Sequence, residues 1–144
     1  MFRKTGFTLI ELLLVISLTL LLGTMTSAFG SRFLTQSSVG NTTDLLVSQL
    51  RKAQMNAMLS KGSSNWGVSF QSNAMTLYRG NSYNTRVVAL DEKFSVDAGV
   101  QVSGLSDVNF SKVSGFPGTT PTITISGAGE TETIIISSQG MVSR

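Results

Sequence analysis

The side chains that could do chemistry in this sequence are carboxylates, hydroxyls and scattered cations, because the chain contains neither histidine nor cysteine. Without histidine no Ser–His–Asp arrangement can activate a nucleophile. Without cysteine neither a disulfide nor a thiolate metal site can form. The serines also lack the G-x-S-x-G spacing that presents a nucleophile at a strand–helix turn. We therefore expect a protein that is not an enzyme and that uses no cofactor.

Three carboxylates lie close together in the sequence and could supply the oxygen ligands that calcium prefers, namely Asp91, Glu92 and Asp97. Their spacing does not follow the pattern of an EF-hand loop. Solvated loop carboxylates explain them equally well, so we expect no metal site.

Five cations could contact the phosphates of a nucleic acid: Arg79, Arg86, Lys93, Lys112 and Arg144. Trp66, Tyr78 and Tyr83 could stack on bases. The cations are scattered, however, and removal of Arg3 and Lys4 with a short leader lowers the formal net charge from +3 to +1. That charge is not typical of a polyanion-binding surface. Trp66 is also explained as a core anchor at the start of a strand.

Glu11 is the one charge between Phe7 and Phe29, a run that is otherwise apolar or weakly polar. At about 1.5 Å per helical residue this run can cross a hydrocarbon core of about 30 Å. A secretory signal would have a shorter apolar region and then a small-residue cleavage site, whereas Leu12–Leu22 continues into Gly23. A plain anchor and a secretory signal stay open as alternatives. An acidic residue at the centre of a membrane helix costs roughly 2.5–3.5 kcal/mol, which favours a helix whose partner offers a positive charge.

The segment Thr5-Gly6-Phe7-Thr8-Leu9-Ile10-Glu11 resembles the processing signal of type IV prepilins and type II secretion pseudopilins. The resemblance implies that a prepilin peptidase cuts between Gly6 and Phe7 and then N-methylates the new amino group of Phe7. It also implies that Glu11 faces the amino terminus of a neighbouring subunit during assembly. An exposed ammonium and a buried carboxylate would each relieve the desolvation cost of the other.

The remaining pattern predicts an amphipathic helix followed by a β-rich head. Leu46, Leu50, Ala53 and Ala57 recur at helical spacing, which predicts a helix from Thr42 to Ser60 that ends at Lys61-Gly62. The preceding stretch from Gly30 to Asn41 is poor in helix formers and is interpreted as a linker. Short alternating runs then predict eight strands. They are Trp66–Phe70, Met75–Arg79, Arg86–Leu90, Phe94–Asp97, Val100–Ser103, Val108–Lys112, Thr122–Ser126 and Thr133–Ser137.

The expected fold class is α+β, in which a long hydrophobic helix continues into an amphipathic helix packed on an antiparallel, β-sandwich-like head. We divide the chain into a cleaved leader at 1–6, a transmembrane or filament-core helix at 7–29, a linker with the amphipathic helix at 30–61, and the head at 62–144. The segments Phe110…Gly115, Thr122-Ile123-Thr124-Ile125 and Ile134 to Gly140 resemble the heads of the GspH/FimT group of minor pseudopilins and minor pilins.

The two resemblances imply a structural subunit, a minor pilin or pseudopilin. Such a subunit is a single-pass protein of the bacterial inner membrane before assembly and part of a cell-surface pilus (a fimbrium) or a periplasmic pseudopilus afterwards. Its partners would be prepilin peptidase, other subunits, the inner-membrane assembly platform and, before assembly, membrane lipid. The alternative is a DNA-binding minor pilin of natural transformation, with contacts at Arg79, Arg86, Lys112 and Arg144. A lone membrane-anchored β-domain is a third hypothesis.

Overall fold

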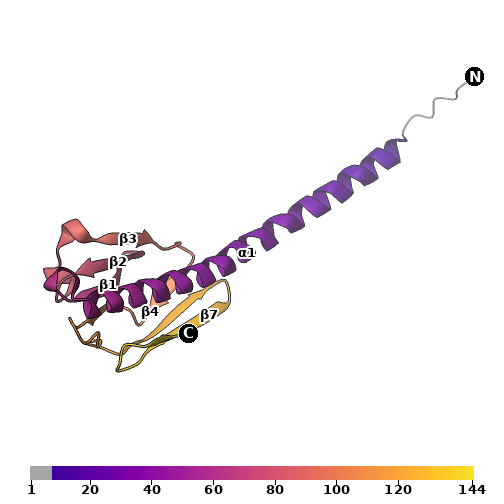
Figure 1. Cartoon of the computed structure of the whole chain (residues 1–144). Helices are drawn as coiled ribbons and strands as arrows, with labels where there is room; N and C mark the ends of the chain where they lie inside the picture. The colour runs from indigo at the N-terminus through magenta and orange to yellow at the C-terminus, as the bar shows by residue number, and fades with distance from the viewer. Residues whose placement is uncertain (1–7) are drawn as a thin grey trace, which may run out of the picture. The chain divides into compact units, whose positions relative to one another are not determined.

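The helix α1 (Leu9–Met58) is the longest element of the computed structural model, which describes residues 8–144, with the side chains of residues 25–36 left aside (Figure 1). Contacts divide the chain into two units, Met1–Leu34 and Thr35–Arg144. The first unit holds the early turns of α1. The second unit holds the later turns together with all the strands that the structure describes.

The expected linker from Gly30 to Asn41 is helical in the structure, where α1 passes through it without a break in its assignment. A single glycine in a helix costs only about 1 kcal/mol relative to alanine. Ending and restarting the helix would instead leave several backbone groups without partners. The sequence pattern therefore overestimated the effect of the isolated glycines on the backbone.

The head contains two antiparallel sheets of four strands each. In the first sheet the order is β3 (Glu92–Ser95), β2 (Ala74–Arg79), β1 (Trp66–Gln71) and β5 (Asp107–Phe110). In the second sheet it is β4 (Gln101–Ser103), β6 (Thr122–Gly127), β7 (Glu130–Ile136) and β8 (Val142–Ser143). The α+β expectation is thus confirmed: helix α1 packs on two antiparallel sheets.

Two hairpins fix the register of the sheets. Gln71 pairs with Ala74 and Gly127 pairs with Glu130, so each hairpin has a two-residue loop. Both loop residues have positive φ in each case, at Ser72 and Asn73 in the first hairpin and at Ala128 and Gly129 in the second. Turns of this kind match the twist of the flanking strands. One face of each strand is thereby directed toward the core.

The core lies between the later turns of α1 and the two sheets. The predicted stripe of Leu46, Leu50, Ala53 and Ala57 is fully buried. It joins one buried cluster with residues of both sheets, among them Val68, Leu77, Val108, Ile123, Ile125 and Ile134. Trp66 is 5% exposed, which confirms its interpretation as a core anchor. Burial of this apolar area, worth about 25 cal/mol per Å², holds the helix on the sheets.

The predicted strands need correction at several places. The strand expected at Arg86–Leu90 is wrong, because the segment forms a short 3₁₀ turn at Val88–Leu90 whose apolar side chains are exposed. The strand expected at Phe94–Asp97 spans Glu92–Ser95, the one expected at Val108–Lys112 spans Asp107–Phe110, and the one expected at Thr133–Ser137 spans Glu130–Ile136. The two-residue strand β8 was not expected. A strand of two residues is too short to show alternation of apolar and polar side chains. It forms after a tight turn that is closed by a hydrogen bond from the Ser137 N–H to the Met141 carbonyl.

Candidate functional site

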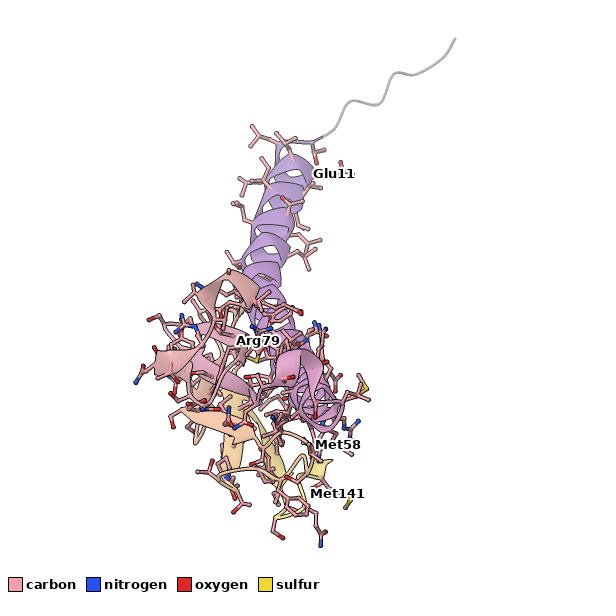
Figure 2. The ribbon with its side chains drawn as sticks, turned by 60° about the vertical axis from the view of Figure 1, so that its left-hand side comes forward. Glu11, Met58, Arg79 and Met141 are labelled. Atoms are coloured by element: carbon pink, nitrogen blue, oxygen red, sulfur yellow. The ribbon has the colours of Figure 1, made fainter. Side chains whose placement is uncertain are left out.

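Glu11 lies in the first turn of α1 on an exposed surface (Figure 2). Its backbone N–H donates to the Thr8 carbonyl at 3.1 Å and contacts Thr8 Oγ1 at 3.4 Å. Thr8 therefore occupies the N-cap position, and Thr8-Leu9-Ile10-Glu11 has the spacing of a capping box. Within the part of the chain that the structure describes, no ion pair involves the Glu11 carboxylate.

The surface around Glu11 is apolar. Leu9 is 80% exposed, and the large apolar side chains that follow are also exposed, namely Ile10, Leu12, Leu13, Leu14, Val15, Ile16, Leu18, Leu20, Leu21 and Leu22. The hydroxyls of Ser17 and Thr19 donate hydrogen bonds to helix carbonyls of the preceding turn, namely those of Leu13 and Ile16, so they add no free polar group to this surface. Among the residues described, no helix is both long and apolar enough to cross a membrane.

Gly6 and Phe7, the residues expected to be processed and methylated, lie outside the described residues. The expected cleavage between Gly6 and Phe7 therefore rests on the sequence alone. Thr8 and Glu11 are the part of the motif that the structure places.

Arg86, one of the proposed DNA contacts, is held inside the head. Its Nε lies 2.8 Å from Oδ2 of Asp91, and Nη1 donates to the Tyr83 carbonyl at 2.6 Å. The guanidinium also stacks over the Tyr83 ring at 3.7 Å from the ring centroid. The hydrogen bond to Asp91 raises the pKa of Arg86. These contacts close the loop between β2 and β3 and explain why no strand forms at Arg86.

Arg144, another of the four proposed DNA contacts, is also paired with acidic side chains. Its two terminal nitrogens reach Asp44 of α1, at 2.8 Å, and Glu132 of β7. The hydrogen bond to Glu132 raises the pKa of Arg144. The guanidinium therefore links the helix to the second sheet.

Arg79 and Lys112 differ from these two arginines, because neither makes an ion pair with another described residue. Trp66 pairs with Arg79 on one side and with Phe110 on the other, so Arg79 and Lys112 lie at the same end of the first sheet. The backbone N–H of Lys112 donates to Asn65 Oδ1. Of the four candidate DNA contacts, Arg79 and Lys112 thus lie at one end of the first sheet, whereas Arg86 and Arg144 form ion pairs with carboxylates.

The three carboxylates considered for calcium each have a separate contact. Asp91 pairs with Arg86, and Glu92 lies 2.7 Å from the Lys52 ammonium. Asp97 accepts a hydrogen bond from the Gly99 N–H at 2.7 Å. Over the described residues, no cluster of three or more acidic side chains is placed to hold a metal ion.

Sequence reasoning missed a polar network at the edge of the first sheet. Tyr78 donates to Asp107 Oδ1 at 2.5 Å, and the Tyr83 N–H donates to Oδ2 of the same carboxylate at 3.1 Å. Asn109 donates both to the Tyr78 oxygen and to the Gly80 carbonyl. Burial, followed by the hydrogen bond to Asp107, raises the pKa of Tyr78. No local motif marks this network, because Tyr78 and Asp107 are 29 positions apart.

Comparison with known proteins gave one result. Residues 1–27 match the family model described as the prokaryotic N-terminal methylation motif. The comparisons with curated proteins and with solved structures gave no match. The chain therefore carries the prokaryotic N-terminal methylation motif in a sequence that continues into an α+β head.

Proposed function

We propose that this chain is the precursor of a structural subunit of a type IV pilus or a type II secretion pseudopilus. The observation that carries the proposal is the methylation motif at residues 1–27, followed by a helix with an exposed apolar surface that bears one carboxylate. Prepilin peptidase cuts after Gly6, and the amine of Phe7 is N-methylated. Before assembly the apolar helix sits in the bacterial inner membrane.

Assembly exchanges lipid contacts of α1 for contacts with the helices of neighbouring subunits. Glu11 pairs with the N-terminal amine of a neighbour, because neither charge is stable alone in apolar surroundings. The exposed apolar side chains from Leu9 to Leu22 provide the packing surface on either side of that pair. The inner-membrane platform and the other subunits are the partners in this step.

Within this class we favour a minor pilin or pseudopilin of the GspH/FimT type. The Ile- and Thr-rich segments that resemble that group form β6 and β7, a hairpin whose isoleucines Ile123, Ile125 and Ile134 are buried beneath α1. The resemblance and this packing support the assignment. The amount of the protein in purified filaments, relative to the other subunits, tests it.

Mass spectrometry of the mature protein tests the processing step directly. The expected N-terminal peptide begins at Phe7 and carries one added methyl group. A Gly6→Leu variant should retain its leader, because the side chain at the cleavage position becomes bulky, whereas Gly6→Ala should retain partial processing. A mature wild-type protein that still begins at Met1 would overturn the proposal.

DNA binding is the second candidate function, and one observation favours it. Arg79 and Lys112 lie at the same end of the first sheet and have no acidic partner among the described side chains. In that case the chain would be a DNA-binding minor pilin of natural transformation. Salt-dependent retention of labelled DNA by the full chain tests this alternative, since phosphate contacts weaken as salt rises.

A further inference from the structure

Six exposed apolar side chains surround the C-terminal end of α1, and we define them as the helix-end patch: Met55, Met58, Leu59, Val113, Phe116 and Met141. They come from three segments that the structure holds together. The Val113 N–H donates to the Ala57 carbonyl at 3.0 Å. Gln54 donates to the carbonyls of Gly115 and Gln139. Figure 2 shows Met58 and Met141 at the same end of the head.

Core packing does not explain the side chains of this patch. Leu59 is 70% exposed, and Val113 and Met141 are each 68% exposed. Val113 also has a φ of 72°, which is rare for a β-branched residue and costs backbone free energy. The hydrogen bond to Ala57 uses the backbone N–H and does not require valine, and glycine adopts a positive φ more easily. Exposed apolar groups that gather in this way are typical of interaction surfaces.

The patch has a positive border. The three segments that form it, residues 51–64, 111–118 and 137–144, contain no acidic residue. Lys61 is two residues from Leu59 and Lys112 precedes Val113 in the sequence; neither is in an ion pair with a described residue, although the Lys61 ammonium lies over the Trp66 ring at 5.5 Å from its centroid. Arg51 donates to the Val142 carbonyl at 3.1 Å and likewise makes no ion pair within the described part of the head. Lys61, Lys112 and Arg51 are therefore the cations of these segments that have no carboxylate partner among the described residues, whereas Lys52 is paired with Glu92 and Arg144 with Asp44 and Glu132.

A cleft of about 400 Å³ adjoins the patch between α1 and the edge of the second sheet. Arg51 and Gln54 line it from the helix, and Ile135, Met141 and Val142 line it from β7 and the C-terminal segment. An apolar side chain of a partner can enter such a cleft while a neighbouring carboxylate reaches Arg51. Binding hot spots commonly lie where an anchor side chain fills such a pocket.

We propose that the helix-end patch and its cleft dock a segment of another protein in which an apolar side chain is flanked by carboxylates. A second copy of this chain is a poorer occupant, because its own positive border would face the same charges. A lipid surface is also a poorer occupant, because a flat interface does not fill a cleft. Methionine side chains adapt to the shape of a bound partner, which suits this role. The proposal does not depend on processing at Gly6.

Methionine methyl NMR of the full chain, held in neutral-lipid nanodiscs, tests the proposal. Met55, Met58 and Met141 report on the patch, and the buried Met75 reports on the core. The probes are two peptides of equal length, one alternating Leu with Asp and the other alternating Leu with Lys. The Leu–Asp peptide should shift the three patch methyl signals and leave Met75 unchanged, and the Leu–Lys peptide should shift none.

Charge-reversal variants test whether the positive border contributes to peptide binding. Lys61→Glu combined with Lys112→Glu should weaken binding of the Leu–Asp peptide about tenfold, because like charges then face each other. Lys93→Glu, which changes an exposed cation on β3, is the matched control and should leave binding unchanged. Equal shifts with both peptides, or no shift with either, would overturn the proposal. So would patch shifts caused by anionic lipid nanodiscs alone or by raising the protein concentration without peptide, which would identify a membrane or a second copy instead.

Discussion

Nη1 of Arg144 lies 2.8 Å from Oδ1 of Asp44, a contact between residues that are 100 positions apart. The other terminal nitrogen of the same guanidinium donates to Glu132. Both nitrogens of the arginine fork are thus directed at carboxylates of the same chain. Two carboxylates already balance the charge of this guanidinium, and this argues against Arg144 as the main DNA contact.

Arg144→Ala should therefore leave any DNA retention by the full chain unchanged at low salt. Arg79→Ala combined with Lys112→Ala should abolish the retention, because these cations have no acidic partner to displace. A filter-binding titration over a series of salt concentrations measures both effects. The result that contradicts this prediction is a fall of about one in the salt slope for Arg144→Ala, which is the effect of losing one phosphate contact.

Glu11→Gln separates two roles of this residue. Glutamine, like glutamate, is accepted at the N3 position of a capping box, three residues after the N-cap, so α1 should begin at the same residue. It cannot pair with a neighbouring ammonium as a charge. We expect normal membrane insertion and a loss of the protein from sheared filaments, measured by immunoblots of the two fractions. Asp44→Asn is the matched control, because it removes a carboxylate of α1 that is 71% exposed while its partner Arg144 keeps its contact with Glu132. Normal incorporation of Glu11→Gln would show that the charge is dispensable.

The sequence predicted the parts of the fold that follow a local period or a local turn. Leu46 and Leu50 mark the buried face of α1 because packing repeats with the helical turn, and α1 ends at Met58, close to the predicted end at Lys61-Gly62. The contacts that failed prediction follow no regular period, whether they join neighbours or distant positions. The loop at Arg86 depends on Tyr83 stacking and on Asp91, and β8 depends on a turn closed through Ser137. For the candidate site, the motif around Glu11 could be recognised in the sequence, whereas the acidic partners of Arg144 could be identified only in the tertiary structure.

Gly140→Ala should destabilise the head. Gly140 has a φ of 84°, and an added Cβ would lie 2.3 Å from Gln54 Nε2 and 2.7 Å from the Gly115 carbonyl oxygen. Backbone strain and this clash together should lower the free energy of unfolding by about 2 kcal/mol or more. Gly118→Ala is the control, since its Cβ would meet no atom closer than 3.7 Å. Urea unfolding followed by circular dichroism compares the two variants, and equal midpoints would contradict the prediction.

Tyr78→Phe should change how the stability of the head depends on pH. Burial and the bond to Asp107 raise the pKa of Tyr78 above its ordinary value of 10.0. Below pH 10 the hydroxyl is protonated in both the folded and the unfolded chain, so its contribution is fully present. Above pH 10 the unfolded chain loses this proton while the folded chain keeps it, and stability falls as the pH rises further.

The wild-type chain should therefore lose stability between pH 10 and 11.5 at up to about 1.4 kcal/mol per pH unit from this group. Tyr78→Phe should be less stable at neutral pH by about 1.5–3 kcal/mol, because a hydrogen bond to a charged group is lost, and should show a shallower decline in alkali. Tyr83→Phe, which keeps the Tyr78–Asp107 bond, should retain the wild-type slope. Urea unfolding at pH 8, 10 and 11.5 measures the slopes, and a steep decline in Tyr78→Phe equal to that of the wild type would show that other groups control alkaline unfolding.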